Sequence, residues 1–466
     1  MYLHLIHLAN KRKASFKLSI TTTSPNETFT LPLISGGSFN FTTNWGDGTA
    51  DSTITAYNSS SRIHTYTSAG TYTISMWGTC TRFRFDDSGD KLKLKKVLDF
   101  VDMGFTALNF SGCSNLTSIS SNMKKLTHLT DATNLFYNCS SLTSIPTGIF
   151  DGSTGITSFY YTFYHCTSLT SIPTDLFRYN TSSSLYSFSG TFYGCTGITS
   201  IPTDLFRYNI KVENFSDTFN SCSGLTSLPT DLFRYNTKVT DFNYCFSSCS
   251  ALTSIPTDLF RYNTEVLSFF ATFSYCTNLT SLPDDSFKYN TKVDTFSCAF
   301  NTTGLTSLPT DLFRYNTAVT TFEEIFFKCY SLATIPTDLF RYNTAVTNFS
   351  GIFIECTSLA SVPIALFKYN ILANNFNMTF FRCNKLQLNT QIFWETGERD
   401  TRFHDISVNF GQCFSRTTFT GTQGTAPDLW NCDFGTGTPT KTDCFDGAGN
   451  SETSLTNYTD IPTDWK

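Results

Sequence analysis

The stretch Cys222–Asn236, CSGLTSLPTDLFRYN, decides the fold because it returns along most of the chain. Its last ten residues recur almost unchanged at Ser171–Asn180, Ser200–Asn209, Ser254–Asn263, Ser307–Asn316 and Thr334–Asn343. Prolines such as Pro229 and Pro256 mark an interval of 27 residues. A fixed period of this length is the signature of a solenoid, in which each unit stacks on the next. The repeat therefore predicts a scaffold with a binding surface.

The composition narrows the classes of function. The chain has 466 residues, a net charge of −5 and only 15% charged residues. No basic stripe is present, so nucleic acid is not expected as a partner. Phe is unusually frequent, at 47 residues. We expect a β-rich stack with Phe inside and small polar residues outside.

The sixteen cysteines come mainly from one cysteine per repeat. Stacking would place them in one buried column as reduced thiols, because near-identical sites give no reason for unique pairs. The pairs Cys245/Cys249 and Cys329/Cys356 lack further ligands at zinc spacing. We therefore predict neither a metal nor any other cofactor.

The N-terminal stretch 1–15 is expected to be a tail, with docking on a larger assembly as the alternative. Its start, MYLHLIHLANKRKA, is a poor secretory signal because the basic cluster follows the apolar run. No segment approaches the roughly 20 apolar residues of a membrane span. We expect no membrane insertion and no export by the usual secretory route.

Residues 16–85 alternate polar and apolar side chains in FKLSITTT, FNFTTNW and HTYTSAGTYTISMW, which predicts a small β module. The turn Trp45-Gly46-Asp47-Gly48-Thr49 followed by His64-Thr65-Tyr66 resembles the PKD-type immunoglobulin-like domain. That resemblance implies a β-sandwich used as a spacer or adhesion module, with Trp45 in the core and Asp47 bonding its own backbone. The charge-rich stretch 86–112 is interpreted as the junction and N-terminal cap of the repeats.

The repeat resembles the BspA-like leucine-rich repeat surface proteins. Residues Asn236–Ile255, NTKVTDFNYCFSSCSALTSI, follow the pattern of that family, with Phe in place of Met and an additional PTDLFRYN segment in each unit. The resemblance implies a leucine-rich-repeat-like solenoid over 113–390. We interpret 391–466 as a degenerate C-terminal capping region. The predicted fold is thus mainly β with short helical turns, an Ig-like sandwich followed by a solenoid of about 27-residue units.

Within a unit, we expect a short strand at Leu-Thr-Ser-Ile and a helical turn over the segment after the proline. One basic residue per unit forms a column beside a column of aspartates: Arg178, Arg207, Arg234, Arg261, Arg314 and Arg341. Pairing with Asp and stacking on Tyr would compensate the repulsion within this column. We interpret this face as scaffold; the alternative is a site for a repeating anionic polymer.

Other positions change freely between units, and drift on a solvent face or recognition of a partner would both explain this. The candidate binding face drawn from these positions consists of Tyr244, Phe270, Tyr275, Glu323, Glu324, Phe327, Lys328, Glu355, Phe381 and Arg382.

No catalytic constellation is apparent, since the six histidines are scattered without an acid or nucleophile at useful spacing. We therefore predict a non-enzymatic adhesion or recognition protein. The PKD-like and BspA-like resemblances together favour a bacteriophage virion surface or tail-fibre component that binds a host surface protein or glycan. Other virion proteins would contact its tail and PKD-like domain. The alternatives are a bacterial cell-surface adhesin and a carbohydrate-binding accessory protein.

Overall fold

The computed structural model describes residues 14–416, 423–448 and 455–466, so most of the expected N-terminal tail lies outside the described residues. The chain divides into two compact units, Met1–Val212 and Glu213–Lys466. No helix among the described residues is long and apolar enough to cross a membrane. The expectation of a mainly β chain with few helices is confirmed.

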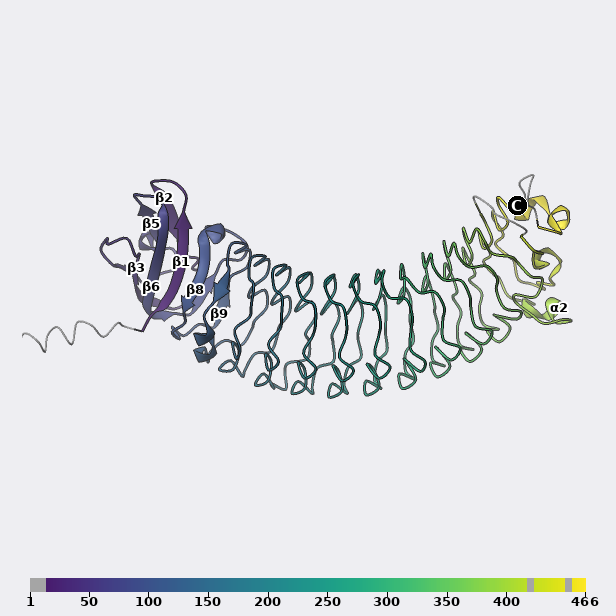
Figure 1. Cartoon of the computed structure of the whole chain (residues 1–466), viewed down its shortest axis with the longest axis horizontal. Coiled ribbons are helices and arrows are strands. Elements are labelled where there is room, and N and C mark those ends of the chain that lie inside the picture. The colour runs from purple at the N-terminus through teal and green to yellow at the C-terminus, as the bar shows by residue number, and fades with distance from the viewer. Residues whose placement is uncertain (1–13, 417–422, 449–454) are drawn as a thin grey trace, which may run out of the picture. The chain divides into compact units, whose positions relative to one another are not determined.

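The first unit contains all ten strands and begins with a β module (Figure 1). Its main sheet has six strands in the order β10-β8-β1-β6-β3-β4, and β2-β5 and β7-β9 form two smaller sheets. The strands are β1 (Phe16–Thr22), β2 (Glu27–Thr30), β3 (Phe39–Asn44), β4 (Ser52–Ile54), β5 (Ile63–Tyr66), β6 (Gly70–Cys80), β7 (Arg82–Arg84), β8 (Leu94–Asp99), β9 (Ala107–Asn109) and β10 (Ser118–Ile119).

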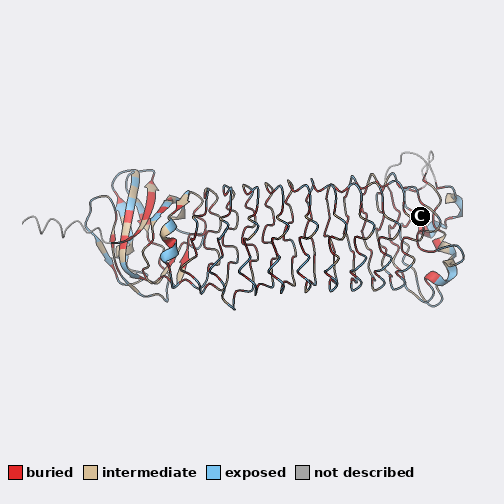
Figure 2. Ribbon diagram, turned by 60° about the horizontal axis from the view of Figure 1, so that its bottom comes forward, coloured by how far each residue is buried: buried red, intermediate tan, exposed pale blue. Residues whose placement is uncertain are grey.

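Burial alternates along the strands as the period of two requires, which is visible in Figure 2. In β3, Phe41 faces the core while Asn40 is exposed. β1 pairs antiparallel with both β6 and β8, and β10 pairs parallel with β8. The sheet therefore continues past residue 85 into the stretch interpreted as a junction.

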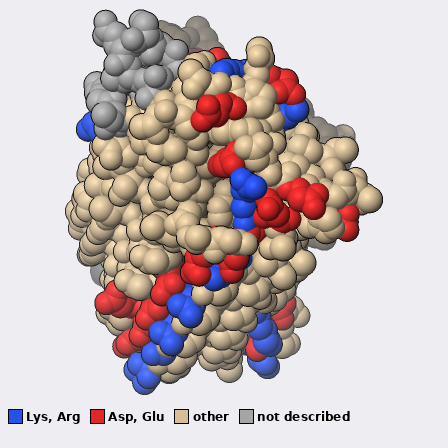
Figure 3. Space-filling view, turned by 90° about the vertical axis from the view of Figure 1, so that its right-hand side faces the viewer, with Lys and Arg blue, Asp and Glu red and all other residues tan. Residues whose placement is uncertain are grey.

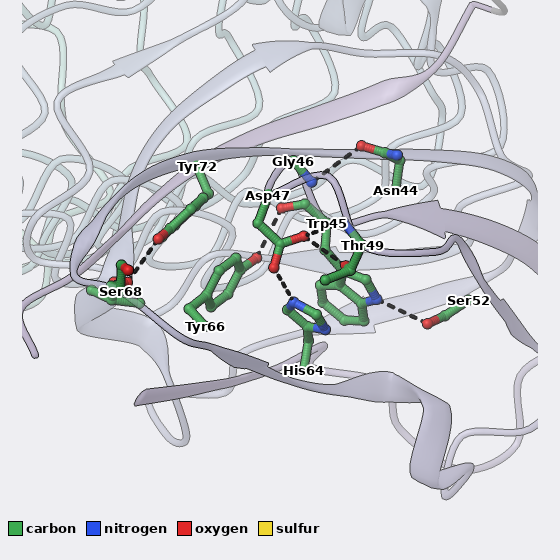
Figure 4. A network of polar contacts seen from close by, with 11 residues as sticks. Asn44, Trp45, Gly46, Asp47, Thr49, Ser52, His64, Tyr66, Ser68 and Tyr72 are labelled. Atoms are coloured by element: carbon green, nitrogen blue, oxygen red, sulfur yellow. Dashed lines mark hydrogen bonds and ion pairs between the residues drawn. The ribbon is translucent and has the colours of Figure 1, made fainter. Parts of the chain in front are cut away.

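The turn that follows β3 is fixed by side-chain hydrogen bonds (Figure 4). Asp47 accepts bonds from the backbone N–H and hydroxyl of Thr49, and its other oxygen lies 2.7 Å from Nε2 of His64. The His64 ring stacks on Trp45 at 4.7 Å, and Tyr66 donates its hydroxyl to the Trp45 carbonyl. Asp47 thus bonds its own backbone, as expected, and also ties the turn to β5.

This network predicts a pH-dependent contribution to stability. Burial acts to raise the pKa of Asp47, but the hydrogen bonds from Thr49 and His64 outweigh it and lower the pKa below its ordinary value of 3.8. A lowered carboxyl pKa stabilises the fold above that value, and the contribution is lost as the pH falls through the folded pKa. We expect Asp47→Asn to lower the melting temperature at pH 7, with the difference from the unaltered chain shrinking below about pH 4. Thermal unfolding followed by circular dichroism between pH 3 and pH 7 checks this prediction. A difference in melting temperature that does not depend on pH would contradict it.

The second unit consists of turns of chain that lie side by side in chain order (Figure 1). Parallel bridges join them at one recurring position: Asn214, Asp241, Ser268, Thr295, Thr321, Asn348, Asn375, Asn409 and Thr440. Further parallel bridges join Ser361 to Gln387 and Leu388 to Gly424. Neighbouring turns also exchange backbone bonds in the loop that follows, for example from Tyr244 N–H to Phe270 O at 2.9 Å. Each turn therefore supplies hydrogen-bond partners to the next.

Two local expectations differ from the structure. The segment after the proline forms consecutive i to i+3 turns, such as Arg261 N–H to Asp258 O, rather than a helix. The Leu-Thr-Ser-Ile segments of the second unit form no strand; a backbone bond links several of the equivalent segments to the previous turn, as from Gln387 N–H to Ala360 O. The bridges between these turns are isolated, so no continuous ladder forms.

Phe side chains fill the interior as expected. Phe260, which is 1% exposed, lies between Phe233 and Phe287 at ring distances of 6.2 and 6.1 Å. The rings of Phe242 and Phe269 approach it at 4.8 Å each. Aromatic pairs at such distances add to the stabilisation that burial alone supplies.

The asparagine that ends each PTDLFRYN segment is also buried, which the sequence analysis did not anticipate. Asn290 donates from Nδ2 to Asn263 O at 2.9 Å and to Phe260 O at 3.1 Å. The same pair of bonds recurs along the second unit, and we call these residues the Asn column: Asn263, Asn290, Asn316, Asn343 and Asn370.

The cysteines form the expected buried column of free thiols. The Sγ of most repeat cysteines donates to a Phe carbonyl of the previous turn, as Cys276 does to Phe246 at 3.2 Å. Thr303 takes the place of the missing cysteine, and its hydroxyl lies 3.2 Å from Cys329 Sγ. Burial raises the pKa of Cys276 to about 12, so its reactive thiolate is scarce at neutral pH.

The thiols should therefore resist modification in the folded chain. Only Cys298 and Cys432 are not fully buried, and burial with the charges of Glu324 and Glu323 raises the pKa of Cys298 to about 12. We expect slow alkylation by iodoacetamide at these two sites at most, and rapid alkylation of all sixteen cysteines in guanidinium chloride. Peptide mass spectrometry reads out the sites. Rapid labelling of Cys276 in the native chain would be inconsistent with this packing.

The C-terminal region carries the α-helix described in the second unit, α2 (Arg399–Arg402), and three 3-10 helices at Leu429–Asn431, Tyr458–Asp460 and Thr463–Trp465. The first unit has 3-10 helices at Ser60–Arg62, Lys91–Lys93 and Ser121–Lys125. Trp394 contacts Phe393 at 6.0 Å, and Trp465 contacts Phe410 at 6.2 Å. Trp430 also contacts Phe445, at 6.1 Å, so each of these three tryptophans packs against a Phe ring of the C-terminal region.

Candidate binding face

The ten residues of the candidate binding face all lie in one kind of loop, between the first inward Phe of a turn and its cysteine. Backbone bonds connect consecutive loops, for example from Ala271 to Ser297, from Cys298 to Glu323 and from Glu324 to Ser350. The structure therefore aligns the loops side by side. We call these loops, each lying between the first inward Phe and the cysteine of its turn, from 243–248 to 377–382, the variable face.

Six of the ten residues have left-handed backbone conformations. Their φ angles lie between 51° and 59°, a region that costs most L-residues roughly 1–2 kcal/mol and that glycine adopts freely: Tyr244, Tyr275, Glu324, Lys328, Glu355 and Arg382. Phe270, Glu323, Phe327 and Phe381 each directly precede a residue with positive φ. Each loop needs two left-handed residues, so every unit presents the same backbone with different side chains.

The structure brings several of these side chains together. The rings of Tyr244 and Phe270 make an edge contact at 5.2 Å. The ammonium of Lys328 lies 5.0 Å from the Phe327 ring centre. These contacts form separate aromatic and charged patches along the variable face.

A second cluster joins two later loops. Glu355 and Arg382 form an ion pair at 3.3 Å, and Arg382 also lies over the Phe381 ring at 4.9 Å. Tyr330, which the sequence analysis did not select, donates its hydroxyl to Glu355 at 3.4 Å and is 46% exposed. Tyr275 is 51% exposed, and Glu323 is also exposed.

The column of basic residues is compensated as expected. Arg314 pairs with Asp311 at 3.2 Å and lies between the rings of Tyr315 and Tyr342 at 5.7 and 5.2 Å. Figure 3 shows the resulting bands of basic and acidic side chains next to each other. Since each of these cations has a nearby carboxylate, the column offers little surplus charge to an anionic polymer.

The first unit carries an aromatic cluster at the equivalent loop positions, which the sequence analysis did not identify. Tyr164 stacks on Tyr137, His165 and Tyr193 at 4.6, 4.4 and 4.7 Å. A Cβ on Gly194 would lie 2.4 Å from the His165 ring, so a side chain there would displace the ring. The run FYYTFYHC, which departs from the other units, was the available signal.

Among the described residues, no cluster of three or more His, Cys, Asp or Glu side chains could hold a metal ion. The predicted absence of metal and cofactor remains a prediction. What the described geometry offers at the variable face is contact chemistry: exposed rings, paired charges and a regular loop backbone.

These features define the chain as a repeat protein in which near-identical turns stack on one another. Residues 106–226, 186–303 and 268–394 match the family described as "Mycoplasma protein of unknown function, DUF285". The matches span more than half of the chain, and the chain belongs to this family. No curated protein matches the chain.

The chain is also similar to solved leucine-rich repeat structures. One is a leucine-rich repeat protein from Bacteroides ovatus, with 15% identity, a TM-score of 0.27, and coverage of 68% of this chain and 74% of that one. Another is a leucine rich cell surface protein from Faecalibacterium prausnitzii, with 18% identity, a TM-score of 0.25, and coverage of 68% and 93%. A chain of the Drosophila Toll–Spatzle complex matches at 14% identity and a TM-score of 0.28, covering 63% of this chain, which spans only 42% of that one. No enzyme family was identified.

Proposed function

We propose that the chain is a non-enzymatic recognition protein that displays the variable face to a partner at a biological surface. The partner is a surface protein or a glycan. The single observation that supports this is the choice of side chains at the left-handed loop positions.

If stability alone selected these positions, Gly, Asn and Asp would predominate, because they tolerate left-handed backbone best. Some loops follow that preference, with Asn134, Asn138, Gly190 and Gly194. Other loops depart from it and carry bulky or charged residues instead, among them Tyr161, His165, Tyr244, Glu324 and Lys328. Side chains kept at a cost in stability, on an exposed strip, point to recognition rather than drift.

Substitution by glycine tests the premise. We expect Glu324→Gly and Lys328→Gly each to stabilise the chain by up to about 1 kcal/mol, because the left-handed backbone is then relieved. Glu324→Ala is the matched control, since it removes the carboxylate but keeps the Cβ. Urea unfolding measures the difference. Equal stabilities of the glycine and alanine variants would show that these positions are not strained.

Binding is tested with the full chain against intact bacterial cells, arrayed glycans and arrayed surface proteins. The face variant combines Glu323→Ser, Glu324→Gly, Phe327→Asn and Lys328→Thr, residue types found at equivalent positions of neighbouring loops. We expect it to weaken binding by about tenfold or more. The control Leu267→Thr changes a side chain that is 47% exposed and lies outside the variable face, and should leave binding unchanged. Binding that survives in the face variant would overturn the assignment.

We propose further that residues 16–85 act as a PKD-like spacer and 113–390 as a leucine-rich-repeat-like solenoid. Two locations fit: a phage virion and a bacterial cell surface. Mass spectrometry of phage particles and of bacterial membrane fractions, searching for the unique segment 394–402, separates them. Stoichiometric recovery in particles would establish a virion component, whereas recovery only in membranes would establish the bacterial adhesin.

A further inference from the structure

A cavity of about 700 Å³ opens where the regular repeat ends. Its wall includes Tyr369, Ile371, Leu372, Phe393, Arg402 and Ile406. A volume of this size accommodates a small molecule. The lining combines these apolar side chains with the buried cation Arg402, and it also includes Lys368, Glu398 and Thr401.

The apolar wall differs from the preceding turns of the second unit, although Ile210 of the first unit holds the position equivalent to Ile371. Ile371 and Leu372 stand where the preceding turns carry Thr344-Ala345 and Thr291-Lys292. They are 60% and 56% exposed, so burial in the fold does not account for their apolar character. Two adjacent, exposed and bulky apolar side chains form a patch that another molecule can cover.

Arg402 ends the Asn column. Its Nη2 donates to Asn370 O at 2.9 Å and approaches Phe367 O at 3.5 Å, the two acceptors that another asparagine would have used. A neutral amide would have sufficed for these bonds. The guanidinium instead brings a charge into a site where it is only 7% exposed.

That charge lacks an acidic partner among the described residues. Nε and Nη1 of Arg402 have no hydrogen-bond acceptor, and the only aromatic compensation is the Phe403 ring at 4.5 Å. The nearby glutamates Glu395 and Glu398 are bound instead to Lys368, at 2.8 and 3.3 Å. A buried cation without a counter-ion is costly, so an anion at the cavity would be favoured.

We propose that this cavity binds a carboxylate with an apolar body, with the carboxylate at Arg402 and the chain against Ile371 and Leu372. A small turn of the guanidinium toward the ligand gives Nε or Nη1 the acceptor it lacks. The site uses none of the residues of the variable face, so it stands or fails independently of the proposed recognition function.

Isothermal titration of the full chain with octanoate below its micelle concentration tests the proposal, with octanamide as the neutral analogue of equal length. We expect octanoate to bind about tenfold or more tightly than octanamide. A blocked dipeptide that ends in a free leucine carboxylate distinguishes a peptide terminus from a free acid as the natural source. The proposal would be overturned if octanoate and octanamide bound equally well. It would also be overturned if neither octanoate nor the dipeptide carboxylate bound.

Variants assign the binding to this cavity. Arg402→Gln keeps an amide donor for Asn370 and removes the charge, so octanoate affinity should fall about tenfold while octanamide is unaffected. Leu372→Thr should weaken both ligands. Ile364→Thr, at a side chain that is 55% exposed and outside the lining, is the control. Unchanged octanoate binding in the first two variants would place the ligand elsewhere, and circular dichroism confirms that each variant is folded.

Discussion

Replacing Phe260 with alanine is expected to destabilise the second unit by about 3–5 kcal/mol, the range for removing a buried aromatic side chain. The ring is 1% exposed and contacts Phe rings from its own turn and from both neighbouring turns. Its loss leaves a cavity that adjacent turns cannot fill, since their positions are fixed by backbone bonds between units. Urea unfolding followed by circular dichroism measures the shift.

Phe270→Ala is the matched control for this experiment. Phe270 is half-buried on the variable face and contacts Tyr244, so its removal should cost no more than about 1 kcal/mol. If the two substitutions cost the same, the stacked Phe interior would not be the main source of stability.

Asn290→Asp is expected to be the second large effect, and the pH should control it. The amide donates to two backbone carbonyls in a fully buried position, 1% exposed. An ionised carboxylate there would face two oxygens and lose its hydration, which we expect to cost about 3–5 kcal/mol at pH 7. Burial would raise the folded pKa of the new carboxyl, so the part of the penalty that comes from its charge is absent below the unfolded pKa of about 4 and grows as the pH rises above it.

Urea unfolding at pH 4 and pH 7 separates charge from packing in this comparison. Asn290→Ala removes the same two donors without a charge, and its cost should change little between the two pH values. Thr291→Ala, at an exposed neighbour, should be nearly neutral. A penalty for Asn290→Asp that does not depend on pH would show that the asparagine site is open to water.

The sequence was sufficient to predict features that follow from the chemistry of a single residue type. Phe and Cys are apolar, and their regular spacing was enough to place them inside. The Asn column was missed because asparagine normally indicates a turn; its constancy after every Arg-Tyr pair was the unused signal. Its burial depends on carbonyls from the previous turn, which no single unit contains.

For the variable face, the sequence identified the residues but not their backbone conformation. The variation itself selected residues such as Tyr244 and Glu324, but it could not show that they share a left-handed backbone. That conformation belongs to the loop and is compatible with many side chains at a modest cost. The role of Arg402 could not be predicted either. It depends on a hydrogen bond from the Arg402 side chain to the carbonyl of Asn370, the last asparagine of the column.

The bridges between turns allow whole repeats to be lost by recombination without interrupting the stack. Asp241 pairs with Ser268, and Ser268 pairs with Thr295 in the same parallel manner. Recombination between near-identical copies that removes Ser268–Asp294 would bring Thr295 beside Asp241 with every ladder continuous. The length of the protein can therefore vary between strains in whole turns while its fold persists, so that reach and the set of displayed loops can evolve together.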